Sequence, residues 1–294
     1  MKAFKQSFPK VTLLLFFFVF ACLILSSCAR NKIVQIKGSD TMVNLAQALA
    51  EDYMESRSQV PLAVTGGGSG VGIAALINKN ADIALSSRDM TRHEIDLAVT
   101  AGVLPNEIQV GSDGIAVVTS LKNPINKLTI KQLSDIFNGK TTNWRELGGP
   151  DKEIVALSRD RNSGTHVFFL EEIVKLGNKK NPNEFAREVL MLPSTQAIVE
   201  EVASNPEAIG YIGLGYITER TKVLSVAEKE GTSYVFPDEI TCANGQYPIA
   251  RPLFFYTNRA PAGVIKGFID YVFTKQGQAI VKDMGFVPLK VKGR

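Results

Sequence analysis

Four short apolar runs in this chain each end in a turn rich in Gly, Ser or Thr that leads straight into a helix-like stretch. The runs with their turns span residues 33–41, 61–70, 81–88 and 153–165. This alternation predicts an α/β fold, because strands separated by helices form mainly parallel sheets. The carboxyl ends of parallel strands meet at one edge of a sheet, so we expect the four turns to gather there.

The four turns carry the chemistry of an anion site. Each begins a helix, whose first backbone N–H groups lack partners and lie at the positive end of the helix dipole. Glycine lets an anion approach the backbone, and hydroxyl groups donate hydrogen bonds without adding charge. Ser, Thr and Asp are also preferred N-caps, so capping alone explains any single turn. Four together, two of them with Arg in the loop, favour a site for a small oxyanion.

Apolar spacing predicts two of the helices that follow these turns. One helix should bury the face that carries Met42, Leu45, Leu49 and Tyr53. A second should bury Val167, Leu170 and Val174 and end at Gly177.

The length of 294 residues exceeds what one hydrophobic core usually serves and predicts two lobes. Two strand-like runs, 114–120 and 247–257, are placed to carry the chain between the lobes. We therefore expect residues 33–112 and 248–294 to form one lobe and residues 113–247 the other. Each lobe should hold a mixed, mainly parallel sheet flanked by helices, with two crossing strands as the hinge.

The first 27 residues predict an export signal. A basic segment, 1–10, precedes an almost wholly apolar segment, 11–25, which is too short for a membrane-spanning helix. The following Leu25-Ser26-Ser27-Cys28 resembles the lipobox of bacterial lipoproteins. It predicts cleavage before Cys28, acylation of that residue with palmitate among the acyl chains, and a tether over residues 28–32. A conventional signal with an incidental cysteine, or an uncleaved anchor, stays an alternative.

The distribution of charge excludes a nucleic-acid partner. Three of the 33 basic residues lie in the leader, which leaves 30 against 29 acidic residues in the remainder. A nearly neutral body without a Lys/Arg cluster offers no electrostatic footprint for DNA or RNA. We expect a monomer outside the cytoplasm, held by its lipid on a bacterial membrane, either the cell membrane or a periplasmic face.

Few residues of the mature chain could serve catalysis. With Cys22 removed and Cys28 acylated, Cys242 is the single remaining cysteine, so no internal disulfide can form. His93 and His166 are the only histidines, they lack metal-ligand spacing, and the chain has no G-x-S-x-G motif. These features predict a binding protein with no metal or cofactor rather than an enzyme.

The motifs in sequence order resemble those of the phosphate-binding proteins of ABC-type phosphate uptake systems, which belong to the periplasmic-binding-protein type II family. The segments that carry this resemblance are 38–41 (GSDT), 66–73 (GGGSGVGI), 81–88 (ADIALSSR), 159–165 (RDRNSGT), 205–216 (NPEAIGYIGLGY), 247–257 (YPIARPLFFYT), 276–281 (QGQAIV) and 285–289 (GFVPL). The resemblance implies a two-lobed periplasmic-binding-protein fold that closes on a buried phosphate without a cofactor and delivers it to an ABC permease.

The resemblance also implies which residues surround the anion. They are Ser39, Thr41, Ser69, Ser87, Arg88, Arg159, Ser163, Gly164 and Thr165. Many members carry an Asp that accepts a proton from phosphate where this chain has Ser87. Asp40 is then the first candidate for the acceptor and Asp89 the second, although Asp40 also suits a helix cap. We expect Arg251 to form a structural salt bridge at the strand crossing in preference to a ligand contact.

Two other functions fit the same residues. A receptor for another oxyanion, such as sulfate or molybdate, would use the same donors. An extracytoplasmic hydrolase of phosphate esters would need a metal set or a nucleophile–base pair, for which the sequence offers no convincing candidate.

The lipobox predicts that Cys28→Ala abolishes both lipid labelling and cleavage by the lipoprotein signal peptidase. Stable anchoring needs more than one acyl chain, so the modified cysteine should carry several. Metabolic labelling with a radioactive fatty acid, together with N-terminal sequencing, measures both effects. Release of the wild-type protein with residue 28 inside the chain would contradict the prediction.

Overall fold

The computed structural model describes residues 33–57 and 61–290. The predicted signal sequence, Cys28 and nearly all of the tether lie outside the described residues. The described residues from Val34 onward form one compact unit by their contacts. Among the residues that the structure describes, no helix has both the length and the apolar character needed to cross a bilayer.

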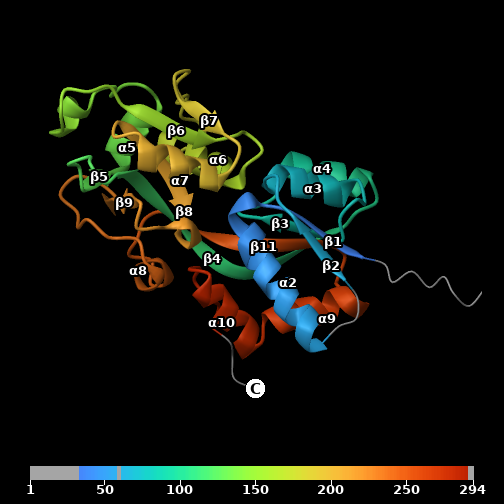
Figure 1. Ribbon diagram of the computed structural model, residues 1–294. Helices are drawn as coiled ribbons and strands as arrows, with labels where there is room; N and C mark the ends of the chain where they lie inside the picture. The colour runs from blue at the N-terminus through green and yellow to red at the C-terminus, as the bar shows by residue number, and fades with distance from the viewer. Residues whose placement is uncertain (1–32, 58–60, 291–294) are drawn as a thin grey trace, which may run out of the picture. The chain divides into compact units, whose positions relative to one another are not determined.

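A mixed sheet runs through the whole described part in the order β2-β1-β3-β11-β4-β8-β6-β7, with β9 paired to β4 (Figure 1). Three parallel strands form one end: β1 (Val34–Gly38), β2 (Leu62–Thr65) and β3 (Ile83–Ser86). Each of them leads into a helix: α2 (Val43–Arg57) after the short η1 (Asp40–Met42), α3 (Ser69–Ile77) and α4 (Arg92–Thr100). The strand–turn–helix order predicted for these three segments is therefore confirmed.

Two long strands join the ends of the sheet. They are β4 (Pro105–Ser120) and β11 (Ala250–Asn258), which pair antiparallel. The first half of β4 pairs with β11 up to Gly114, and from Ile115 onward β4 pairs with β8 (Ala208–Gly213) instead. The two segments predicted to carry the chain across the molecule are thus strands, and β4 begins nine residues earlier than its apolar run, at Pro105.

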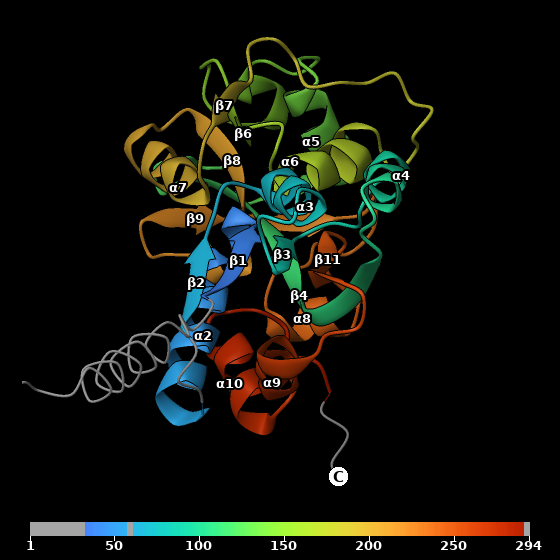
Figure 2. The same cartoon turned by 90° about the vertical axis from the view of Figure 1, so that its right-hand side faces the viewer.

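The other end of the sheet repeats the parallel arrangement. There β6 (Val155–Arg159) lies parallel to both β8 and β7 (Leu190–Leu192), while β9 (Thr221–Val223) runs antiparallel to β4. A separate pair is formed by β5 (Lys127–Thr129) and β10 (Ser225–Ala227). The flanking helical segments are α5 (Ile130–Phe137), η2 (Trp144–Leu147), α6 (Gly164–Phe169), η3 (Leu170–Val174), α7 (Thr195–Ser204), η4 (Leu214–Tyr216) and α8 (Glu239–Ala243). The last two helices are α9 (Gly263–Val272) and α10 (Lys275–Asp283), which pack with α2 at the first end (Figures 1 and 2).

The buried apolar side chains form two large cores. One draws its residues from 34–110 and 253–286, and the other draws them from 115–249 together with Val287. A smaller cluster packs α3 and α4 against β3 and β11. Two cores on one mixed sheet, flanked by helices, match the predicted two-lobed α/β fold.

The predicted helix faces had different outcomes. Met42, Leu45 and Leu49 are fully buried and Tyr53 is 7% exposed, as the spacing predicts. The second helix differs, because α6 continues into a π-helical turn, η3, which changes the spacing of the buried side chains. Val174 is fully buried, as predicted, but Phe169 and Ile173 are buried as well, whereas Val167 and Leu170 are only half-buried.

Candidate functional site

The four predicted turns place five hydroxyl side chains together, which we call the hydroxyl cluster: Ser39, Thr41, Ser69, Ser87 and Thr165. Ser39 follows β1, Ser69 begins α3, Ser87 follows β3, and Thr165 lies in the first turn of α6. All five side chains are at most 2% exposed. Figure 2 shows α3 beside α6 above the ends of β1 and β3, where these turns meet.

Direct hydrogen bonds hold the cluster together across long stretches of sequence. Ser39 Oγ donates to Ser87 Oγ at 3.0 Å, and Ser69 Oγ lies 3.3 Å from Ser87 Oγ. Thr41 Oγ1 and Thr165 Oγ1, which are 124 residues apart in the chain, lie 2.8 Å from each other. Because a hydroxyl group both donates and accepts, the same groups can bind a protonated oxyanion.

Two glycines allow this close approach. A Cβ atom added to Gly164 would lie 2.3 Å from Ser69 Oγ and 2.6 Å from Ser87 Oγ. Gly38 has a φ of +142°, and a Cβ there would lie 2.2 Å from the carbonyl oxygen of Leu85. Neither position can hold a side chain without moving the hydroxyl groups or the strand ends.

Ser163 acts as the N-cap of α6. Its Oγ accepts from the backbone N–H of Thr165 at 3.2 Å and of His166 at 3.5 Å. The bond fixes the first turn of α6, and with it the Thr165 hydroxyl in the cluster.

Arg159 lies at the end of β6, 1% exposed, and most of its donors are engaged. Nη1 pairs with Asp40 Oδ2 at 3.1 Å and donates to Thr195 Oγ1 at 2.7 Å. Nε and Nη2 donate to the carbonyl oxygens of Leu192 and Pro193. Three of the five N–H groups of this guanidinium thus donate to protein acceptors, and the charge is paired with Asp40.

Asp40, the candidate proton acceptor, is part of the same contact. Besides pairing with Arg159, Oδ2 accepts from the backbone N–H of Thr195 at 2.9 Å. The Tyr216 hydroxyl donates to the backbone carbonyl oxygen of Asp40 at 2.9 Å. Asp40 therefore links the β1–α2 turn to the N-terminus of α7 rather than acting as a simple cap of its own helix.

Arg88 turns its guanidinium toward α4. Its Nη1 and Nη2 donate to the two carboxylate oxygens of Glu94 at 2.8 and 2.7 Å, and Nη1 also donates to the carbonyl oxygen of Asp89. Burial by itself raises the pKa of Glu94, but hydrogen bonds from Arg88 and Thr91 outweigh it, and the pKa is lowered overall. Arg88 is thus close to the cluster in sequence while its charge is paired within its own loop and helix.

The sequence did not predict how close Arg251 lies to the hydroxyl cluster. The expected salt bridge is present, with Nη2 at 3.1 Å from Asp113 Oδ2 on the neighbouring strand. The same Nη2 also lies 3.3 Å from Thr41 Oγ1 and 2.9 Å from Thr165 Oγ1. A charged residue inside the apolar run 247–257 was the available signal, and the β4–β11 register supplies its partner.

The Arg251–Asp113 pair is deeply buried, at 2% and 0% exposure. Burial raises the pKa of Asp113, and the Arg251 guanidinium opposes that rise. Burial likewise lowers the pKa of Arg251 while Asp113 opposes the change. Because arginine stays protonated in proteins, the pair places a fixed positive charge beside the two threonine hydroxyls.

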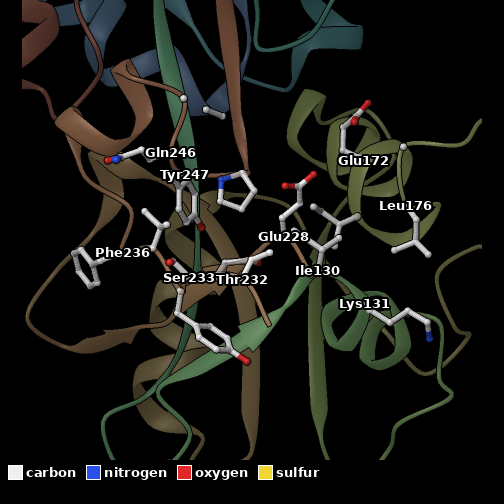
Figure 3. Close-up of a pocket in the computed structure, with 18 residues that line it drawn as sticks. Ile130, Lys131, Glu172, Leu176, Glu228, Thr232, Ser233, Phe236, Gln246 and Tyr247 are labelled. Atoms are coloured by element: carbon white, nitrogen blue, oxygen red, sulfur yellow. The ribbon is translucent and has the colours of Figure 1, made fainter. Parts of the chain in front are cut away.

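A separate cavity of about 1130 Å³ lies away from this cluster (Figure 3). Its lining includes Lys131, Glu172, Glu228 and Phe236, and none of the predicted site residues. The carboxylates of Glu172 and Glu228 in this lining disfavour the binding of an anion. No group of three His, Cys, Asp or Glu suited to a metal ion occurs within residues 33–57 and 61–290. The hydroxyl cluster with its two arginines is therefore the candidate site.

Comparisons with known proteins identify the family of this chain. Residues 26–276 match the family model described as a PBP superfamily domain. The phosphate-binding protein PstS of Borreliella burgdorferi is 30% identical over 266 residues, which cover 88% of this chain and 91% of the relative. The PstS protein of Pseudomonas aeruginosa is 31% identical over 273 residues, covering 87% and 82%. A substrate-binding protein assigned to a phosphate ABC transporter of Clostridium perfringens, crystallised with bound phosphate, superposes with a TM-score of 0.78 at 30% identity and covers 88% of this chain and 100% of its own.

The Arg88–Glu94 pair predicts a pH-dependent loss of stability in Glu94→Gln. At pH 7 the variant should lose about 1.5–3 kcal/mol of unfolding free energy, because it replaces a charge-assisted bidentate pair. The folded-state pKa of Glu94 is below its ordinary 4.5, so this contribution is present above pH 4.5 and is lost as the pH falls through the folded-state value. Denaturant unfolding at several pH values measures the difference.

Asp96→Asn on the same helix is the control, since its partner Arg92 is 85% exposed and a surface pair contributes about 0–1 kcal/mol. A Glu94→Gln loss that is the same at pH 3 and pH 7 would show that packing, not charge, is responsible.

Proposed function

This chain belongs to the PBP superfamily and, within it, to the family of phosphate-binding proteins, and on that premise we propose that it captures inorganic phosphate outside the cytoplasm and delivers it to an ABC-type permease. The observation that carries the proposal is the hydroxyl cluster: five buried hydroxyl groups from four turns, in contact with buried Arg251, while buried Arg159 pairs with Asp40 in the first of these turns. Like its relatives, the chain is a binding protein and not an enzyme. No covalent bond is therefore made or broken.

The donors of the cluster suit a dehydrated phosphate ion. Phosphate loses its hydration shell when it is buried, and hydroxyl groups can replace the lost hydrogen bonds. Because hydroxyl groups are neutral, they neither repel the anion nor add positive charge to the site. Arginine adds a fixed charge with planar donors that match an oxyanion. We propose that the inner residues are Ser39, Thr41, Ser69, Ser87, Arg159, Ser163, Gly164 and Thr165. Arg88 supports this set from outside, by fixing the turn after β3 through Glu94.

We propose that residues 33–112 and 248–294 form one lobe and residues 113–247 the other. The division of the apolar side chains into two cores near Gly114 and Ala250 supports these limits. Thr41 and Asp40 then belong to the first lobe, and Thr165 and Arg159 to the second. An anion bound by both sets would stabilise the closed arrangement, with β4 and β11 as the hinge.

We further propose that the protein is a lipid-anchored monomer. The lipobox-like segment before Cys28 supports the anchor, and residues 28–32 would serve as the tether to the membrane. Lipid attachment would keep the captured anion close to the permease.

A receptor for sulfate or molybdate is the second candidate, and one observation favours considering it. Ser87 replaces the expected acceptor carboxylate, and the two carboxylates nearest the cluster, Asp40 and Asp113, are both paired with arginine. A hydroxyl group can accept the proton of phosphate, but it repels sulfate less than a carboxylate would. A site without an acceptor carboxylate therefore discriminates less strongly against sulfate.

Calorimetric titration of the mature chain, refolded to remove bound anion, tests the ligand. We expect phosphate to bind at least about tenfold more tightly than sulfate or molybdate, because the hydroxyl groups can accept its proton. The three anions should be titrated at one pH and one ionic strength. Tighter binding of sulfate than of phosphate would overturn the ligand assignment.

Arg159→Ala should weaken phosphate binding by about 10- to 150-fold, the equivalent of one charge-assisted hydrogen bond of roughly 1.5–3 kcal/mol. Stability should also fall, because Asp40 loses its charge partner, so affinity is measured by titration at a temperature where the variant is folded. Arg161→Ala is the matched control, since Arg161 is exposed on the same loop. An unchanged affinity in folded Arg159→Ala would restrict Arg159 to its structural contact with Asp40.

A further inference from the structure

Arg251 has buried donors that the described protein does not use. Its Nε and Nη1 are inaccessible to solvent and have no hydrogen-bond partner within residues 33–57 and 61–290. Those two nitrogens carry three of the five N–H groups of the guanidinium. A buried donor without an acceptor is costly, and native proteins rarely keep one without a reason.

The position of the guanidinium supplies a reason. Nη2 contacts the hydroxyl groups of Thr41, in the turn after β1, and of Thr165, in the first turn of α6. The Phe168 ring covers Cζ at 5.5 Å from the ring centroid. The charge is thus enclosed by an aromatic ring and two hydroxyl groups that bind each other, in a place where water is excluded and an anion would interact strongly.

Asp113 fixes Arg251 without offering itself to a ligand. Oδ2 accepts from Arg251 Nη2 at 3.1 Å, and Oδ1 accepts from the backbone N–H of Leu214 at 3.1 Å. Arg251 and Asp113 are also direct partners in the register of β11 and β4. Both carboxylate oxygens therefore have donors, and the side chain is held between two strands.

Arg159 has fewer unused hydrogen-bond donors than Arg251. All three of its nitrogens already donate to protein acceptors, whereas Arg251 uses Nη2 only. The guanidinium with more unused donors is thus the one that was expected to be purely structural.

We propose that Arg251 is a second anion-binding arginine of this site, oriented by Asp113, and that it contacts bound phosphate together with Thr41 and Thr165. The inference rests on the proposed function and adds a residue that determines affinity. Asp113 is a positioning residue in this arrangement.

The test is phosphate titration of a double variant, Arg251→Gln with Asp113→Asn. Replacing both charges by amides avoids leaving one buried charge unpaired, which a single substitution would do. The ligand-free melting temperature is measured alongside the affinity. We expect at least about a tenfold loss of phosphate affinity in the folded variant, from the loss of a charge-assisted contact.

The matched control is Arg145→Gln with Asp151→Asn, an exposed ion pair at 2.9 Å outside the cluster. It removes the same two charges and should leave phosphate affinity unchanged. Arg251→Lys is the second variant, and it decides the matter if the double variant does not fold. It keeps the charge but not the planar donors, so a loss of about threefold or more is expected.

The outcomes separate this inference from the proposed function. If the wild-type protein binds phosphate and the folded double variant, or the Lys variant in its place, binds equally well, Arg251 is a structural residue and the inference is wrong. If the wild-type protein itself does not bind phosphate, the proposed function fails first. A lower melting temperature with unchanged affinity would also assign Arg251 to the fold alone.

Discussion

The structure depends on burying polar and charged side chains between two apolar cores. Five hydroxyl groups, two arginines and Asp113 are at most 2% exposed, and Asp113 and Arg251 lie on the central strands β4 and β11. Such groups are tolerated only when they are hydrogen-bonded, so each turn must deliver its side chain with precision. The glycines at 38 and 164 serve this need, because they remove the Cβ atoms that would keep the turns apart. The strands that precede the four turns all belong to one sheet, which brings the turns to the same region.

Two arginine–carboxylate pairs set the electrostatics of the region. Arg159 pairs with Asp40, and Arg251 pairs with Asp113, each with a nitrogen–oxygen distance of 3.1 Å. Pairing reduces the cost of burying each charge, and it leaves the region close to neutral. A bound oxyanion would then interact mainly with oriented donors, since the fixed charges are already compensated in pairs. This arrangement gives affinity through geometry more than through net charge.

Local patterns allowed most of the frame to be predicted, and they indicated the turns whose hydroxyl groups come together. The four strand–turn–helix junctions, the two crossing strands and the face of α2 follow from apolar spacing and turn residues alone. The second helix face was wrong at Val167 and Leu170, because a π-helical turn is a tertiary adjustment that a regular period cannot indicate. The pairing of Arg88 with Glu94 depends on how the turn after β3 folds back on α4. The place of Arg251 beside Thr41 and Thr165 depends on strand register over sequence separations of 210 and 86 residues.

The same contacts bear on which proton acceptor replaces the missing carboxylate. Asp40 was the first candidate, but its Oδ2 forms an ion pair with Arg159, which compensates its charge, and accepts from the Thr195 backbone N–H. Asp113 has donors on both oxygens. Ser39, Ser69 and Ser87 instead form a chain of hydroxyl groups, and a chain of this kind can reverse the direction of its hydrogen bonds. The group that accepts a proton from a bound anion is therefore best sought in this chain, where Ser87 stands between two other hydroxyl groups and needs no charge to act as an acceptor.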